Sequence, residues 1–350
     1  MHEGGEGTLK ELIRDADYRA EAIERTCELY QLPRDIVEKD FWVCLTLSHL
    51  FHESSYRDSI IFKGGTSLSK AYDIIQRFSE DIDLIIDWRL LGYGLNEPWE
   101  ERSNSKQDKF VKESVPRTNN FLSNVFVPAF REGLSDRLGF QVNVEAGAES
   151  ETVIFSYPRL YPARSALGSI KLEIGPLAAW SPYETATIRP YVADVFQGNA
   201  SQFDIDVRTA VPERTFWEKA TILHQEANRP SSKAMPKRYS RHYYDMYMLG
   251  HSFVLDNALE DLNLLYDVIR FKEKFYRTPW AHLSEAVPGT LRLVPQSERR
   301  GELEADYEAM APMIYGERPS FSELVEYLSE LEEQINYPPQ NLSEDIGFDD

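Results

Sequence analysis

Two aspartates, Asp81 and Asp83, stand at the start of a segment, residues 81–87, whose apolar run gives it the composition of a buried strand. Because side chains alternate between the faces of a strand, both carboxylates project from one face while Ile82 and Leu84 project from the other. Two neighbouring carboxylates repel each other unless a cation lies between them, and all-oxygen ligands suit Mg²⁺ bound together with substrate phosphates. The spacing therefore predicts a metal and phosphate site.

A pair of glycines, Gly64 and Gly65, lies upstream between an expected strand over residues 58–64 and an expected helix over residues 66–75. Glycine lets the backbone approach a ligand closely, and the free N–H groups at a helix start favour an anion. Thr66 is expected to cap this helix. The glycine turn is thus predicted to bind phosphate beside the metal site.

This strand, glycine turn and helix, followed by a D-x-D strand, resembles the active-site signature of the nucleotidyltransferase superfamily that includes DNA polymerase β. Six ordered motifs make the resemblance more specific: EKDFWV (38–43), FKGGTSLSKAY (62–72), RFSEDIDL (77–84), IKLEIG (170–175), PERTFWEKA (212–220) and RHYYDMYML (241–249). In this order they resemble the AbiEii/AbiGii toxin family of bacterial type IV toxin–antitoxin and abortive-infection systems.

The resemblance implies a role for each of ten residues. The implied catalytic residues are Asp81, Asp83, Lys219 and Asp245; the implied metal ligands are Asp81, Asp83 and Glu173; and the implied nucleotide contacts are Gly64, Gly65, Thr66, Ser67, Ser79 and Lys219. The metal would be two Mg²⁺ ions, or Mn²⁺ in their place. Lys219 would steady a phosphate in the highly charged transition state, and Asp245 would orient Lys219 or act as a base. One departure is His242, which stands where many relatives carry an acidic residue.

The activity implied by the resemblance is transfer of a nucleoside monophosphate from an NTP to an acceptor hydroxyl, with RNA, at the tRNA 3′ end, as the acceptor. Growth inhibition and phage defence would follow, and the cognate antitoxin would act without a stable complex. Residues 228–245 combine basic and aromatic side chains, as stacking and phosphate contact require. The basic residues expected to contact RNA are Lys233, Lys237, Arg238 and Arg241. The alternative for this stretch is a solvated surface.

Two alternative functions remain open from the sequence. One is a catalytically silent nucleotide-binding regulatory module, against which the full set of acidic residues and Lys219 argues. The other is a metal-dependent nuclease, which also uses clustered acids but leaves the glycine turn unexplained.

The 350-residue chain carries a formal net charge of −20. This acidity argues against a generalised nucleic-acid coat, because phosphate binding draws on clustered Lys and Arg. No apolar run approaches the roughly 18 residues of a membrane span, and no basic-then-apolar leader opens the chain. The two cysteines, Cys27 and Cys44, show no metal or disulfide spacing. We therefore expect a cytoplasmic protein without a membrane segment.

The expected fold class is α+β, a nucleotidyltransferase-type mixed sheet with flanking helices followed by a mainly helical C-terminal domain. The expected domains are residues 1–200, with N-terminal helices over 8–32 and 33–54; residues 201–337, mainly helical; and a disordered tail at 338–350. Further strands are expected at 140–147, 152–158, 169–175 and 185–191. A helical insertion over 103–138 is expected to be interrupted at Pro116. Trp42, Phe216 and Trp217 are expected in the core.

Overall fold

The computed structural model describes residues 6–79, 81–162, 168–176, 182–196 and 198–338. The chain divides into two compact units, the first made of Met1–Asp73 and Arg77–Val211 and the second of Ile74–Gln76 and Pro212–Asp350. The domain boundary expected between residues 200 and 201 stays a prediction. Most of the expected tail, residues 339–350, lies outside the described residues.

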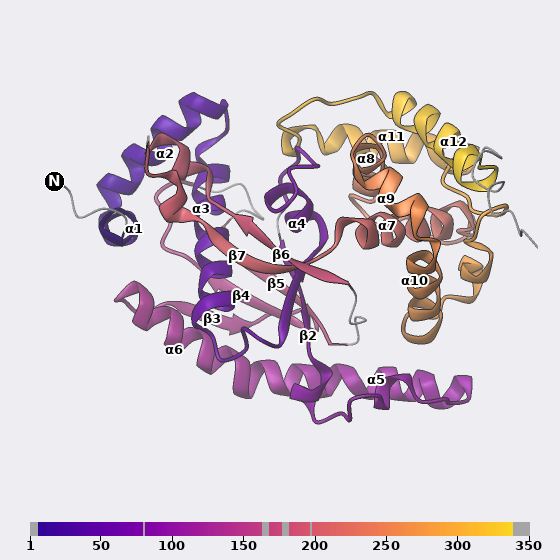
Figure 1. Cartoon of the computed structure of the whole chain (residues 1–350), viewed down its shortest axis with the longest axis horizontal. Helices are drawn as coiled ribbons and strands as arrows, with labels where there is room; N and C mark the ends of the chain where they lie inside the picture. Colours follow the sequence, from indigo (N-terminus) through magenta and orange to yellow (C-terminus); the bar gives the residue numbers. More distant parts are fainter. Residues whose placement is uncertain (1–5, 80, 163–167, 177–181, 197, 339–350) are drawn as a thin grey trace, which may run out of the picture. The chain divides into compact units, whose positions relative to one another are not determined.

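The first unit is built on a mixed seven-stranded sheet with the order β3-β4-β5-β2-β1-β7-β6, which confirms the expected fold class (Figure 1). The strands are β1 (Ile60–Lys63), β2 (Asp81–Ile86), β3 (Asn143–Ala146), β4 (Thr152–Ser156), β5 (Ile170–Gly175), β6 (Tyr183–Ile188) and β7 (Ile205–Ala210). The central strand β2 pairs antiparallel with β1 and parallel with β5. Strand β7 was not predicted, although Ile205 and Val207 alternate with Asp206 and Arg208 as a half-buried strand requires.

One face of the sheet is apolar and supports the central strands. Leu84 of β2 lies opposite Ile174 of β5, and both side chains are almost fully buried. Helix α3 (Arg34–Ser48) contributes Trp42, whose ring meets that of Phe155 on β4 edge-on at 6.1 Å between centroids. The expected core positions of Trp42, Phe216 and Trp217 are confirmed, since all three are fully buried.

The first expected helix, residues 8–32, is two helices in the structure, α1 (Glu6–Arg14) and α2 (Ala16–Tyr30). The break falls at Asp15, whose carboxylate accepts hydrogen bonds from the backbone N–H groups of Asp17 and Tyr18. An aspartate in this role starts a new helix, because it satisfies N–H groups that have no partner within the helix.

The insertion forms α5 (Asn104–Phe121), a π-helical turn (Leu122–Phe126) and α6 (Val127–Leu138). The expected interruption at Pro116 is wrong, because α5 continues through it. Pro116 and Lys112, four residues before it, are both exposed. The carbonyl that loses its helical partner therefore faces water, which reduces the cost of the missing N–H.

The second unit is helical, as expected. Its helices are α7 (Pro212–Ala227), α8 (Arg241–Gly250), α9 (Val254–Glu260), α10 (Leu262–Phe275), α11 (Arg300–Ala309) and α12 (Phe321–Asn336). The short segment Ile74–Gln76 joins this unit because the Gln76 carbonyl accepts a hydrogen bond from the Tyr315 N–H at 3.0 Å. Throughout the described residues, no helix combines the length and apolar character that a membrane crossing needs.

Replacing Pro116 with Ala should stabilise α5, because Ala restores the missing hydrogen bond and removes the steric conflict of the ring. A proline inside a helix costs roughly 3 kcal/mol, so we expect the free energy of unfolding to rise by about 1–3 kcal/mol. Urea denaturation followed by circular dichroism measures the change, and Lys112→Ala serves as a control on the same exposed face. A lower unfolding midpoint for Pro116→Ala would show that the proline is needed in α5.

Candidate active site

Asp81 and Asp83 project from the face of β2 opposite the apolar core, as predicted. Asp83 lies in register with Lys63 on β1 and with Glu173 on β5. Asp81 lies in register with Lys171 on β5. Because residues paired across neighbouring strands share a face, the sheet brings these acidic and basic side chains together.

Lys171 brings a positive charge to this cluster, and the sequence did not indicate its contact with Asp81. Its Nζ atom lies 2.6 Å from Glu173 Oε1, 3.4 Å from Glu149 Oε2 and 3.5 Å from Asp81 Oδ2. Burial alone would lower the pKa of Lys171, but the hydrogen bond to Glu173 and the charges of Asp81 and Glu149 raise it above its usual range. The ammonium therefore stays charged and balances the carboxylates around it.

The two glycines are explained by how closely they approach this face. Gly64 has φ +80°, and a Cβ atom added to it would lie 2.1 Å from Asp83 Oδ2. A Cβ on Gly65 would lie 2.7 Å from Arg77 Nη2 and 3.2 Å from Ser79 Oγ. Gly64 is therefore required, because of its positive φ and its contact with Asp83, whereas a side chain at Gly65 would displace the Arg77 guanidinium.

Helix α4 (Gly64–Lys70) begins two residues earlier than expected. Its N-cap is Lys63, so the prediction that Thr66 caps the helix is wrong. The Thr66 hydroxyl instead donates to the Asp81 carbonyl, and the Ser67 hydroxyl donates to the Gly64 carbonyl at 2.9 Å. A glycine with positive φ allows the helix to start directly after β1, which moves Thr66 inside the helix.

A cavity of about 290 Å³ opens beside Asp83 and Glu173. Lys63 of β1 and Thr152 of β4 also line it, together with Glu149 and other residues of the loop between β3 and β4. The cavity places two of the three predicted metal ligands at an accessible surface.

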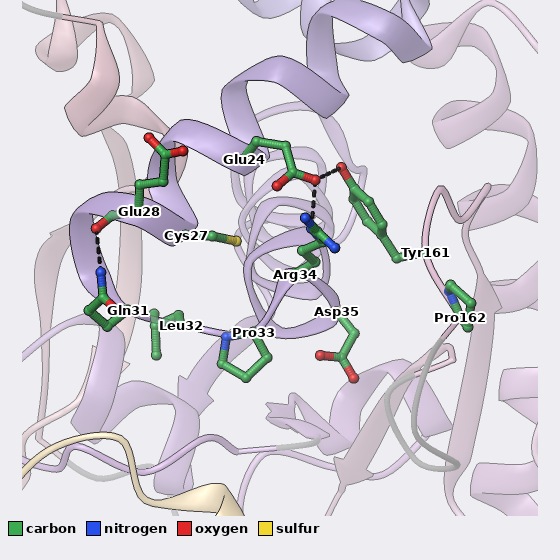
Figure 2. Close-up of a pocket in the computed structure, with 10 residues that line it drawn as sticks. All are labelled: Glu24, Cys27, Glu28, Gln31, Leu32, Pro33, Arg34, Asp35, Tyr161 and Pro162. Atoms are coloured by element: carbon green, nitrogen blue, oxygen red, sulfur yellow. Dashed lines mark hydrogen bonds and ion pairs between the residues drawn. The ribbon is translucent and has the colours of Figure 1, made fainter.

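A second and larger cavity of about 630 Å³ lies where α2 meets α3 and shares no lining residue with the first (Figure 2). Arg34 supplies the guanidinium among its lining residues, and Arg34 Nε lies 2.6 Å from Glu24 Oε1. Glu28 and Asp35 add further negative charge. A triphosphate is therefore a poor occupant of this cavity, despite its size.

Asp81 and Asp83 fit a divalent cation that substrate phosphates and water would complete. The Lys171 ammonium already lies 3.5 Å from Asp81 Oδ2, so this oxygen accommodates positive charge. Among the residues that the structure describes, no three His, Cys, Asp or Glu side chains are grouped to hold a metal by themselves. Mg²⁺ needs only one or two carboxylates from a protein, because phosphates and water can fill its remaining positions. The Glu173 carboxylate is instead paired with Lys171.

In the second unit, Lys219 of α7 and Asp245 of α8 lie together. Lys219 Nζ is 2.8 Å from Asp245 Oδ2 and also donates to His242 Nδ1 at 3.3 Å. Asp245 is fully buried, and Lys219 is 8% exposed. A buried carboxylate and a hydrogen-bond acceptor thus fix the direction of the ammonium.

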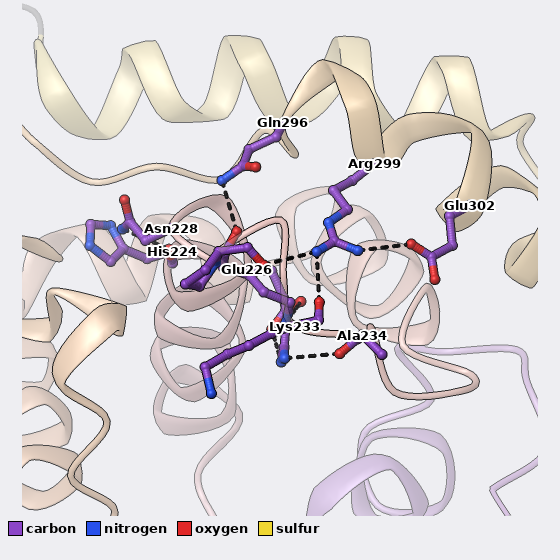
Figure 3. A network of polar contacts seen from close by, with 10 residues as sticks. His224, Glu226, Asn228, Lys233, Ala234, Gln296, Arg299 and Glu302 are labelled. Atoms are coloured by element: carbon purple, nitrogen blue, oxygen red, sulfur yellow. Dashed lines mark hydrogen bonds and ion pairs between the residues drawn. The ribbon is translucent and has the colours of Figure 1, made fainter.

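The basic stretch forms a loop over residues 228–240, ahead of α8, and α11 and its preceding turn hold this loop in place (Figure 3). Arg299 Nη2 donates to three carbonyls of the loop, those of Pro230, Ser231 and Lys233. Asp306 accepts hydrogen bonds from the backbone N–H groups of Arg238 and Ser240 at the other end. Hydrogen bonds from Arg299 and to Asp306 therefore fix the backbone of the loop.

Its side chains divide into two groups. Arg229 is buried and paired with Glu226 at 2.7 Å, and its guanidinium lies over the Trp280 ring at 4.9 Å, so it supports the loop. The residues expected to contact RNA, Lys233, Lys237, Arg238 and Arg241, are exposed.

Two acidic residues of the EKDFWV motif hold the backbone of the first unit. The Glu38 carboxylate accepts the N–H groups of Leu160 and Tyr161 at 2.6 and 3.3 Å. Asp40 accepts the Tyr191 N–H at 2.7 Å and pairs with the buried Lys70 ammonium at 2.7 Å. These contacts join distant segments, and no local pattern in the sequence indicates them.

Residues 46–328 match the model of the family described as nucleotidyl transferase AbiEii toxin, type IV TA system. The chain belongs to this family. The chain is similar to the solved structure of JHP933 from Helicobacter pylori, with 13% sequence identity and a TM-score of 0.43, over 87% of this chain and 93% of that one. It is also similar to MenT4, a nucleotidyltransferase toxin from Mycobacterium tuberculosis H37Rv, with 15% sequence identity and a TM-score of 0.42, over 89% of this chain and 96% of that one. Similarity at this level carries no functional argument. No curated protein matches the chain.

As a member of the AbiEii family, the protein is a nucleotidyltransferase toxin of the type IV toxin–antitoxin class. An NTP substrate and an antitoxin partner follow from this membership, and such enzymes generally use a divalent metal. The charged face of β2 and β5 is the candidate active site, because it contains Asp81, Asp83 and Glu173, the three metal ligands predicted from the sequence.

We expect Gly64→Ala to displace the Asp83 carboxylate and to strain the turn, because the new methyl group would overlap Asp83 Oδ2. The strain of a positive φ costs an alanine roughly 1–2 kcal/mol. Gly92→Ala is a matched control, since Gly92 also has φ +80° but has open space around it. Both variants should lose stability by thermal denaturation, and Mn²⁺ binding should weaken in Gly64→Ala alone. Equal Mn²⁺ affinity in the two variants would contradict the proposed role of Gly64.

Asp245→Asn should strongly destabilise the second unit, because it leaves the buried Lys219 ammonium without its carboxylate. Breaking one side of a buried ion pair costs about 3–5 kcal/mol. The double variant Lys219→Met/Asp245→Asn removes both charges and should be more stable than Asp245→Asn alone. Chemical denaturation of the wild type, Lys219→Met, Asp245→Asn and the double variant tests this, and a double variant that loses the sum of the two single losses would show no coupling.

Proposed function

We propose that the protein transfers a nucleoside monophosphate from an NTP to a hydroxyl of an RNA acceptor, the 3′ end of a tRNA, using Mg²⁺ or Mn²⁺ at Asp81 and Asp83. The observation that supports this proposal most is the pair of carboxylates on one face of β2, of which that of Asp83 packs against the Gly64 turn. Membership of the AbiEii family supports the transfer chemistry.

In the proposed reaction the acceptor oxygen bonds to the α-phosphorus, the bond from that phosphorus to the bridging oxygen breaks, and pyrophosphate leaves. The hydroxyl proton passes to solvent. A divalent cation supplies charge neutralisation for the triphosphate when it is bound. Asp81 and Asp83 hold that charge at a fixed position, and the narrow turn at Gly64 and Gly65 leaves the α4 backbone close to the phosphates.

The remaining predicted contacts belong to the same proposal. Ser79, beside Gly65, offers a hydroxyl to a phosphate oxygen. Lys219 offers an ammonium whose direction Asp245 fixes, and Glu173 acts on the metal through its carboxylate or through Lys171.

The exposed basic loop is proposed to bind the RNA acceptor. Its members Lys233, Lys237 and Arg238, with Arg241 at the start of α8, project from a backbone that Arg299 and Asp306 hold, so little ordering is needed when the RNA binds. Modification of tRNA would stop translation, inhibit growth in the cytoplasm and serve phage defence, with an antitoxin that forms no stable complex with the toxin.

Asp81→Asn and Asp83→Asn should abolish transfer and growth inhibition, because each removes a charge that offsets the triphosphate and its cation. Loss of one electrostatic stabiliser of a transition state typically lowers kcat by roughly 100-fold or more. The purified protein is incubated with Mg²⁺, each α-³²P NTP in turn and total bacterial RNA, and the products are separated on a denaturing gel. Label in a tRNA-sized band from the wild type alone is the expected result.

Glu184→Gln is the matched control, since Glu184 is an exposed carboxylate on the edge strand β6 that shares no row with Asp81 or Asp83. It should transfer label as the wild type does. Label on a protein or a small molecule would show that the acceptor is not RNA. RNA cleavage without added mass would favour a nuclease, and equal labelling by wild type and Asp83→Asn would contradict the assigned site.

A further inference from the structure

The Lys171 ammonium lies beside Asp81, a proposed metal ligand. Its ammonium contacts Glu173, Glu149 and Asp81 at 2.6, 3.4 and 3.5 Å, and the side chain is 26% exposed. Of these three carboxylates, that of Asp81 lies on the central strand β2, and Asp81 is a proposed metal ligand. The ammonium therefore balances the same oxygen atoms that a metal ion would use.

The contacts of Lys171 are unequal, and this suggests how it can move. The shortest contact joins two side chains of the same strand, since Glu173 follows Lys171 by two residues on β5. The contact with Asp81 is 0.9 Å longer. Glu149 is largely exposed, so its carboxylate offers the ammonium an alternative partner at the edge of the cavity. Withdrawal from Asp81 leaves the pair with Glu173 intact.

We propose that Lys171 is a resident counter-ion that holds the acidic face together without metal and must leave Asp81 before a divalent cation binds there. A cation alone has to displace the ammonium from Asp81. A cation that arrives with a nucleotide brings a triphosphate, which gives the displaced ammonium a new anion to pair with. Lys171 thus makes metal binding depend on nucleotide binding and positions the two together.

This inference rests on the proposed function in taking Asp81 as a metal ligand, and Mn²⁺ binding to the nucleotide-free protein tests it without any catalysis. The electron paramagnetic resonance signal of free Mn²⁺ gives the dissociation constant for the wild type, Lys171→Met and Lys171→Arg. We expect Lys171→Met to bind Mn²⁺ about tenfold more tightly, within the usual range of coupling between two ligands. Lys171→Arg keeps the charge and should bind Mn²⁺ as the wild type does.

A non-hydrolysable NTP analogue should strengthen Mn²⁺ binding more in the wild type than in Lys171→Met. If Lys171→Met fails to fold without metal, Mn²⁺ should restore its circular dichroism spectrum, because the ion would then replace the missing ammonium. Equal Mn²⁺ affinity in the wild type and Lys171→Met, or a Lys171→Met protein that Mn²⁺ does not refold, would overturn the role of Lys171.

The double variant Asp81→Asn/Lys171→Met separates this result from the proposed function. We expect it to lose the tight Mn²⁺ binding of Lys171→Met. If Asp81→Asn leaves Mn²⁺ binding unchanged in both backgrounds, the metal site itself is wrongly placed, and the proposed function and this inference fail together. If Asp81→Asn weakens binding but Lys171→Met does not strengthen it, only the inference fails.

Discussion

The parallel register of β2 against β5 is the constraint on which the candidate active site depends. It pairs Leu84 with Ile174 on the apolar face and Asp83 with Glu173 on the charged face. Because side chains alternate along a strand, a shift by one residue would exchange the two faces. Burial of one aliphatic side chain contributes roughly 1.5–3 kcal/mol, so several such residues outweigh the repulsion among carboxylates on the partly exposed face. The hydrophobic core thus holds the acidic cluster in place.

Cations interleaved with the acids make that cluster compatible with a folded protein. Lys63 lies in register with Asp83, and Lys171 lies in register with Asp81, so each acid of β2 has a basic neighbour across the sheet. The charge balance comes from the chain itself. The site is therefore formed before any ligand arrives, which lowers the cost of organising it when substrate binds.

The sequence predicts the local features of this site and misses those that depend on pairing. That Asp81 and Asp83 share a face follows from the two-residue period of a strand. The contact of Lys171 with Asp81 depends on which strand lies beside β2, and the sequences of β2 and β5 do not indicate that these two strands pair. The helix start was misjudged for a related reason: Gly64 adopts a positive φ and allows α4 to begin at once, so Thr66 bonds to the Asp81 carbonyl instead of capping the helix.

The partners of a carboxylate, more than its place in a motif, indicate what it does. The oxygens of Glu38 accept hydrogen bonds from the backbone N–H groups of Leu160 and Tyr161. A ligand at Glu38 would have to break these bonds. Asp245 is enclosed with Lys219, and that pair directs an ammonium. Asp81 faces an ammonium at 3.5 Å on a partly exposed surface, and another cation can take that place. Of these three carboxylates only that of Asp81 is partly exposed, which supports its proposed role as a metal ligand.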